Sequence, residues 1–308
     1  MNGARDLVLR VLGTPVVVVA ATTLTRTQLR ILAYHDVPDS VAFAHQMGYL
    51  ADRYNPVDPA HVLAAVSGEV RLPRRAVWVT FDDGDPSVVE SGQPVLDRYG
   101  IRATLFVCPG VVDTDQPFWW QVVGIALGAG ITVRLGGRTW TDKRLITYLK
   151  TLSDEERRAI VATLLADLVG RTGTSPARRQ VTTQQLSHWV DGGHRLGNHT
   201  WDHPCLDRCS PEEQERQVYE AARWLATHLP GVDPVFAYPN GNWSPRTEAA
   251  LAASGCCIGL EFDHRLARVT EPPLHWSRLR VDTWAPLNRF RAIVSGAHPG
   301  LYHAARIV

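Results

Sequence analysis

The sequence predicts an α/β fold: a distorted, incomplete (β/α) barrel of about seven parallel strands, with a mostly helical insertion. Two observations predict it. Short apolar segments of strand length alternate with longer segments of helical spacing over most of the chain. The apolar run Ala76–Phe81 also stops at two carboxylates, and the N-cap and N1 residues of a helix, Asp85-Pro86, follow directly. We expect an N-terminal extension over 1–28 and a barrel domain over 29–308, with the insertion at about 113–180.

The elements follow in order from apolar spacing, capping residues and glycine or proline stops. The serine at 153 and the glutamate three residues later are typical of a capping box. The serine at 210, followed by a proline, also predicts the start of a helix. The helix pattern at 43–54 repeats apolar residues at helical spacing. The strands are expected at 31–37, 76–81, 103–107, 131–135 (a hairpin with 139–140), 195–198, 235–238, 256–262 and 277–281, and the helices at 43–54, 59–66, 118–129, 153–168, 182–192, 210–229, 244–254 and 286–295.

Composition excludes several classes of protein. Hydrophobic residues make up 45% and charged residues 20%, as in an ordinary globular protein. Lys+Arg 32 against Asp+Glu 31 gives a net charge of +1, so we expect no nucleic-acid partner. Five cysteines, of which Cys256 and Cys257 are adjacent, argue against a disulfide framework.

The N-terminal extension begins with Arg5 and Arg10 and continues into a moderately apolar stretch over 11–24. The stretch is too short and too interrupted to predict a membrane span, so no stable membrane insertion is expected. We expect it to dock on the domain as a helix or strand, in a cytoplasmic protein. The alternative is a weak N-terminal signal for export.

A second motif, more than a hundred residues downstream of the carboxylate pair, indicates that the pair belongs to a metal site. His199 and His203 lie four apart after a brief predicted strand, and Pro204 disfavours a helix there. Two imidazoles and one carboxylate form a metal site with open coordination positions. The alternatives are a solvated turn at Asp82-Asp83, or a zinc site that combines His203 with the cysteines at 205 and 209.

Three motifs resemble those of the polysaccharide deacetylase family, carbohydrate esterase family 4. They are Thr80-Phe81-Asp82-Asp83-Gly84, His199-Thr200-Trp201-Asp202-His203, and Phe236-Ala237-Tyr238-Pro239-Asn240-Gly241, which is similar to the family's Phe-Ala-Tyr-Pro-x-Gly branch. The resemblance runs in the expected order from about residue 31 to 290.

The resemblance implies a divalent metal, expected to be zinc, held by Asp83, His199 and His203. It implies that Asp82 is the general base and that the backbone N–H of Asn240 stabilises the oxyanion. Substrate contacts are expected from His35, Tyr238, Pro239, Trp119 and Trp120, although such aromatic residues also pack in cores.

Two positions depart from the family's pattern. Ala237 stands where many members have an arginine that pairs with the base, which predicts a more basic or less rigid Asp82. The closing Leu-x-Leu-His pattern is absent, so the general acid is assigned to His275, with His264 and Asp282 as alternatives.

We therefore expect a metal-dependent hydrolase that removes an N-acetyl or other acyl group from an amino sugar in a glycan, glycolipid or glycosylated metabolite. The alternatives are a catalytically degenerate carbohydrate-binding protein of the same fold and a non-haem iron oxygenase, since two histidines and one carboxylate also suit Fe(II).

Overall fold

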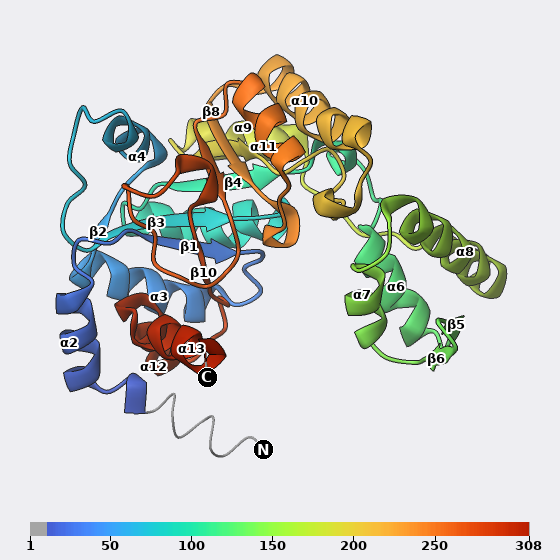
Figure 1. Ribbon diagram of the computed structural model, residues 1–308, viewed down its shortest axis with the longest axis horizontal. Helices are drawn as coiled ribbons and strands as arrows, with labels where there is room; N and C mark the ends of the chain where they lie inside the picture. The colour runs from blue at the N-terminus through green and yellow to red at the C-terminus, as the bar shows by residue number, and fades with distance from the viewer. Residues whose placement is uncertain (1–10, 308) are drawn as a thin grey trace.

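A curled parallel sheet forms the centre of the computed structural model, which describes residues 11–307 (Figure 1). Its seven main strands run in the order β10-β1-β3-β4-β7-β8-β9, every pair is parallel, and β2 pairs with β3. The bounds are β1 Arg30–Tyr34, β2 Asn55–Pro56, β3 Ala76–Phe81, β4 Ala103–Val107, β7 Arg195–Asn198, β8 Val232–Ala237, β9 Ile258–Leu260 and β10 Leu279–Arg280. The predicted incomplete barrel of about seven strands is confirmed.

Helices cover the outside of the sheet and connect its strands. Most lie where capping and spacing predict them, and the expected capping box at Ser153 and Glu156 is present. The bounds are α2 Pro15–Leu24, α3 Ser40–Arg53, α4 Pro59–Val66, α5 Gln93–Arg98, α9 Thr183–Asp191, α10 Pro211–His228, α11 Pro245–Ala253, α12 Leu287–Ser295 and α13 Ala297–Ile307. The prediction that a helix over 286–295 closes the chain is wrong, because α12 stops at the left-handed Gly296 and α13 follows.

Alternation along the strands separates two hydrophobic clusters. On β3, Val77 and Val79 face the helices, whereas Trp78 belongs to the cluster inside the curled sheet. Polar side chains also point into this interior, where they find partners: the Trp78 indole donates to Thr104 Oγ1 at 3.0 Å. The inner face of β3 therefore admits buried polar groups before the strand reaches its carboxylates.

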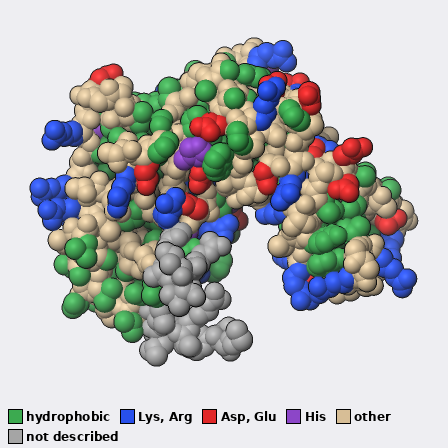
Figure 2. All heavy atoms as spheres, viewed as in Figure 1, with side chains coloured by type: hydrophobic (Ala, Val, Ile, Leu, Met, Phe, Trp, Pro, Cys, Tyr) green, Lys and Arg blue, Asp and Glu red, His purple; other side chains and the backbone are tan. Residues whose placement is uncertain are grey.

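The segment between β4 and β7 contains a lobe that stands apart from the sheet (Figure 1). It contains α6 Trp119–Gly128, the hairpin of β5 Val133–Leu135 and β6 Arg138–Trp140, α7 Arg144–Leu149 and α8 Asp154–Thr172. A hydrophobic cluster of its own holds these elements together. In the space-filling view an open notch separates most of the lobe from the barrel (Figure 2). The lobe thus forms one wall beside the rim of the barrel.

The described part of the N-terminal extension is α2, which packs near α12 and α13, as the docked helix expected for this stretch. Thr25 donates from Oγ1 to the carbonyl of Ser295 at 3.0 Å. Arg5 and Arg10 lie outside the described residues. Within residues 11–307, none of the helices combines the length and the apolar composition that a bilayer crossing requires.

Candidate active site

The carboxyl end of β3 directs its two aspartates to different places. The Asp82 N–H still bonds the Tyr34 carbonyl at 2.9 Å, so Asp82 keeps the strand register and follows Trp78 and Thr80 on the inner face. Asp83 leaves the strand with a φ of 71°, and its side chain reaches the rim instead. The two neighbouring carboxylates therefore occupy separate environments.

The two histidines come from the loop after β7. Asn198 Oδ1 accepts from the Thr200 N–H at 2.8 Å, and Thr200 Oγ1 accepts from the His203 N–H at 3.1 Å. Thr200 and His203 both have positive φ, 70° and 61°. These side-chain bonds support a backbone that would otherwise be unfavourable, and they turn both imidazoles toward Asp83.

One tautomer of His199 fits its surroundings. Its Nδ1 lies 2.7 Å from the backbone carbonyl oxygen of Ala237, which can only accept, so Nδ1 carries the proton. The lone pair of Nε2 then points toward the rim, as in metal-ligating histidines whose second nitrogen donates to a carbonyl.

Asp83, His199 and His203 converge at this rim. Asp83 Oδ1 lies 3.3 Å from His199 Nε2 and 3.4 Å from His203 Nε2, and the three ligand atoms lie within 4.8 Å of one another. This oxygen is buried and has no hydrogen-bond partner among the described residues. An ionised oxygen facing two imidazole nitrogens without bonding either is an arrangement that a shared cation would satisfy.

The three groups of this cluster shift one another's pKa values. Burial lowers the pKa of His199, but Asp82 and Asp83 outweigh it and the net pKa is raised. Burial by itself raises the pKa of Asp83, but the His203 and His199 imidazoles outweigh it and hold that pKa well below its usual range. Burial lowers the pKa of His203 to about 4, against the opposing attraction of Asp83. Asp83 as a carboxylate and His203 as a neutral imidazole are in the protonation states that metal ligands need.

Asp82 has the arginine partner that Ala237 does not provide. Arg278, fully buried after β9, donates from both terminal nitrogens to the two Asp82 oxygens at 2.6 and 2.8 Å. Burial raises the pKa of Asp82, but Arg278 and His199 together outweigh it and the net pKa is lowered. The expectation of a more basic or less rigid Asp82 is therefore wrong: an arginine from another strand segment takes the same electrostatic role. Its only signal in the sequence is that the predicted strand 277–281 contains an arginine.

The third motif forms a 3₁₀ turn over Pro239–Gly241. Asn240 has a φ of 59°, and the N–H groups of Gly241 and Asn242 bond the carbonyls of Tyr238 and Pro239 at 2.8 and 3.2 Å. Tyr238 is fully buried, and its hydroxyl has no hydrogen-bond partner within residues 11–307.

A cavity of about 240 Å³ lies in front of these groups. It brings together the candidate metal ligands, the predicted base Asp82 and most of the predicted substrate contacts. Its lining is His35, Asp82, Asp83, Trp120, Ile146, Lys150, His199, His203, Tyr238, Asn240, Phe262, Arg278 and Arg280. Sequence reasoning missed Lys150, Arg278 and Arg280, because nothing local to their segments indicates the cavity. Lys150 comes from the lobe, directly after α7.

The predicted aromatic contacts divide into two. Trp120 lines the cavity, with its ring 4.4 Å from the His203 ring. Trp119 does not line it. Its indole N–H donates to the His203 carbonyl at 3.2 Å, and its ring packs against the lobe's cluster. Trp119 thus connects the lobe to a ligand-bearing loop. Pro239 is buried in its turn and lies outside the lining as well.

The histidines considered as general acid are not part of the cavity lining. His275 Nδ1 lies 2.9 Å from Glu261 Oε1, and its ring lies against Trp243 at 4.2 Å. His264 Nε2 lies 2.9 Å from His298 Nδ1. The metal-ligand cluster found among the described residues consists of Asp83, His199 and His203, so the alternative zinc site with the nearby cysteines is not formed.

The chain matches the family model described as polysaccharide deacetylase over residues 69–257, more than half its length. It belongs to the polysaccharide deacetylase family, and it is a hydrolase of carbon–nitrogen bonds, a deacetylase.

Individual relatives are distant. The chain is 18% identical over 275 residues to the YxkH protein of Bacillus subtilis, covering 87% of this chain and 76% of that one. It is 43% identical to the poly-beta-1,6-N-acetyl-D-glucosamine N-deacetylase of Staphylococcus aureus, but over only 46 residues, 15% of this chain and 16% of that protein. The structure of the Streptococcus pyogenes deacetylase PplD in complex with acetate has the same fold, with a TM-score of 0.57, 19% identity, and coverage of 83% of this chain and 93% of that one.

Proposed function

We propose that this protein removes an N-acetyl or other small acyl group from an amino sugar within a glycan or glycoconjugate, with the help of a divalent metal. The observation that carries this proposal is the convergence of Asp83, His199 and His203 next to the buried Asp82–Arg278 pair. Supporting it, the name of the Staphylococcus aureus relative specifies an N-acetylglucosamine polymer, and PplD was solved with acetate.

The metal would be held by one oxygen of Asp83 and by Nε2 of each histidine, and an oxygen–nitrogen set of this kind suits zinc. Such an ion supplies Lewis acidity toward a carbonyl and lowers the pKa of a bound water from 15.7 toward about 7.

The chain's own groups supply the rest of the reaction. Asp82 accepts a proton from the attacking water, and Arg278 holds its carboxylate in place and ionised. The N–H groups of Gly241 and Asn242 already bond carbonyls, and Pro239 has no N–H, so the Asn240 N–H is the one that a ligand would use. It would donate to the developing oxyanion. We assign protonation of the departing amine to Lys150 in place of His275, because Lys150 is on the cavity wall.

The size of the cavity favours a small acyl group on a larger chain. Its volume of about 240 Å³ is below the range of about 300–1,000 Å³ for sites that enclose a whole drug-sized ligand. The acyl group and its sugar would occupy the cavity next to Trp120, and further sugars would extend into the notch between lobe and barrel (Figure 2).

The test measures acetate release from β-1,6-linked N-acetylglucosamine oligomers together with the bound metal. Asp82→Asn should lower kcat by about 10² or more while the protein still binds metal. His199→Ala should lose both metal and activity. A full metal complement in the wild type without acetate release from this or other acylated amino sugars would instead indicate a degenerate binding protein. An Asp82→Asn variant with the wild-type rate would refute the assignment of the base.

A further inference from the structure

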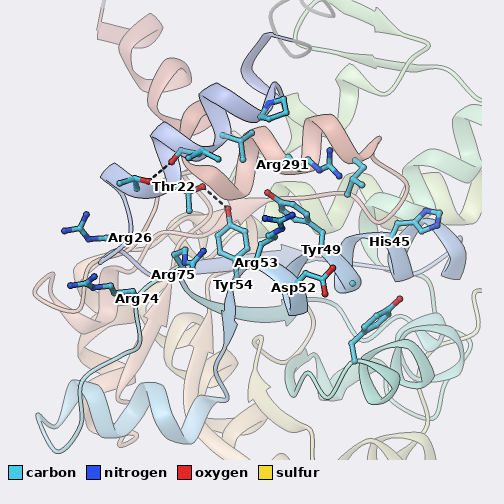
Figure 3. A pocket seen from close by; sticks show the side chains of 18 of the residues that line it. Thr22, Arg26, His45, Tyr49, Asp52, Arg53, Tyr54, Arg74, Arg75 and Arg291 are labelled. Atoms are coloured by element: carbon cyan, nitrogen blue, oxygen red, sulfur yellow. Dashed lines mark hydrogen bonds between the residues drawn. The ribbon is translucent and has the colours of Figure 1, made fainter.

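A second and larger cavity, of about 740 Å³, lies between α2, α3, α12 and the segment before β3 (Figure 3). Its wall is strongly basic. Five arginines line it, and the carboxylate of Asp52 is the acidic group among the lining residues. They are Arg26, Arg53, Arg74, Arg75 and Arg291. None of the five is in an ion pair with a carboxylate within the described part of the chain. The chain as a whole has a net charge of only +1, so positive charge is concentrated locally at this cavity.

Three of these arginines are brought together by backbone bonds. The Arg75 N–H donates to the Arg26 carbonyl at 2.6 Å. Asn55 donates from its side-chain Nδ2 to the Arg74 carbonyl at 2.7 Å and from its backbone N–H to the Arg75 carbonyl at 3.0 Å. Arg75 also has a φ of 57°, which is unfavourable for a side chain of this size. Figure 3 shows Arg26, Arg74 and Arg75 together on one side of the cavity. Like charges held close without an acidic partner favour an anionic ligand.

Arg291, on the other side of the cavity, gives an independent indication. Its guanidinium carbon lies 5.1 Å from the centre of the Tyr49 ring, and its Nε is buried without a hydrogen-bond partner among the described residues. A buried guanidinium N–H is costly to leave unpaired, and an acceptor from outside the chain would satisfy it.

An exposed apolar face borders this cavity. On α2, Val16 is 80% exposed, Val19 64% and Leu24 84%. At about 100° per residue these positions lie within one half of the helix surface. Val19 also lines the cavity, so the apolar face continues into its basic wall.

We propose that the arginine cavity and the exposed face of α2 together form a docking surface for an anionic lipid bilayer. Lipid phosphates would enter the basic cavity, and the valine and leucine side chains of α2 would insert among the upper parts of the acyl chains. A free phosphate or an anionic polysaccharide would account for the arginines alone. The adjoining apolar face distinguishes the bilayer from both.

This placement fixes how the enzyme would face its surroundings. Arg74 and Arg75 precede β3, and Asp82 and Asp83 follow it, so docking surface and catalytic rim lie at opposite ends of one strand. Six residues of strand span about 20 Å. The catalytic rim of the docked protein would therefore face away from the bilayer, toward a substrate in solution.

The test is co-sedimentation of the full chain with two kinds of vesicle. One contains phosphatidylcholine alone, and the other also contains about 30 mol% phosphatidylglycerol. We expect binding to the anionic vesicles, weakened by raising the salt from 0.1 to about 0.5 M. The triple variant Arg26→Gln, Arg74→Gln, Arg75→Gln should bind on the order of a hundredfold more weakly. The matched control, Arg134→Gln, Lys143→Gln, Arg171→Gln, removes the same charge from exposed positions of the lobe and should bind as the wild type does.

A second variant tests the apolar part. Val16→Ser with Leu24→Ser should weaken vesicle binding at least several-fold while leaving deacetylation of a soluble oligomer and the melting temperature near those of the wild type. Equal loss of vesicle binding in the lobe control would overturn the proposal, because it would indicate nonspecific charge. So would wild-type binding of inorganic phosphate or an anionic polysaccharide without binding to the vesicles.

Discussion

Asp82 and Asp83 are identical residues, adjacent in the chain, whose surroundings give them different chemistry. Asp83 faces two imidazoles at the rim, whereas Asp82 faces the Arg278 guanidinium inside the sheet. In both, burial raises the pKa and the facing nitrogen groups outweigh it, so the pKa of each is lowered. In the function proposed here, these different neighbours make Asp83 the metal ligand and Asp82 the base.

Arg278 is a positioning residue, and its removal should have two effects. Arg278→Gln leaves the buried Asp82 carboxylate unpaired, so the free energy of unfolding should fall by about 3–5 kcal/mol. Because Arg278 lowers the pKa of Asp82, its loss should move the acidic limb of the kcat/KM profile to higher pH. Arg278→Lys keeps the charge and should shift the limb less. An unshifted limb in a folded Arg278→Gln variant would show that Asp82 is not the titrating base.

His194 should make the stability of the fold depend on pH. Its side chain is fully buried against Trp189, its Nδ1 accepts from the Ala103 N–H at 3.2 Å, and burial lowers its pKa to about 4 despite the nearby Asp97. The unfolded chain takes up this proton near pH 6.5, so the free energy of unfolding should fall between about pH 6.5 and pH 4, by on the order of 1–3 kcal/mol.

Chemical denaturation at pH 7 and pH 4.5 checks this effect. Carboxylates contribute to the same pH range in wild type and variant alike, so the comparison with His194→Gln isolates the histidine. The difference in unfolding free energy between the two pH values should be smaller in the variant. The same difference in both proteins would mean that His194 does not carry the effect.

At the scale of elements, the lobe completes a cavity that the barrel forms only in part. The segments that follow β3 and β7 supply the carboxylates and histidines. The lobe adds Trp120 from α6, Ile146 from α7 and Lys150 directly after α7 to the wall. Trp119 connects the same lobe to the carbonyl of His203. In the proposed mechanism, the lobe would therefore contribute Lys150 to the reaction and the Trp119 hydrogen bond to the support of the metal-site loop.

Lys150 tests that contribution. Burial lowers its pKa, which favours a proton donor that works near neutral pH. Lys150→Met should lower kcat by about 10–10² with the metal content unchanged, because a general acid contributes to the chemical step. Lys143→Met, an exposed position on the same lobe, and His275→Gln should each retain activity within about twofold. Loss of activity in His275→Gln but not in Lys150→Met would restore the histidine as the acid.

At the scale of the whole molecule, the metal would connect distant parts of the chain. Asp83 follows β3, and the two histidines follow β7 after the whole lobe has intervened. A cation that binds only the folded state stabilises it by about 2.7 kcal/mol at a concentration of one hundred times Kd. Removal of the metal by a chelator should therefore lower the melting temperature by a few degrees.

A melting curve with and without chelator measures this linkage. The His199→Ala variant supplies the control, because it should melt at the same temperature under both conditions. A wild-type melting temperature that changes neither with chelator nor with added zinc would contradict a metal site at these three residues.

The sequence by itself determined the barrel, the positions of most strands and helices, and the four residues Asp82, Asp83, His199 and His203. These depend on local patterns: apolar periodicity, capping residues and short motifs at the ends of strands. The tertiary structure alone decided three features: the pairing of Asp82 with Arg278, the position of Lys150 on the cavity wall, and the clustering of arginines beside α2. Arg278, Lys150 and Arg26 lie in segments whose local patterns differ little from ordinary surface or strand sequence. Their roles arise from which segments the folded sheet brings side by side, and that proximity is a property of long-range packing, which spacing along the chain does not encode.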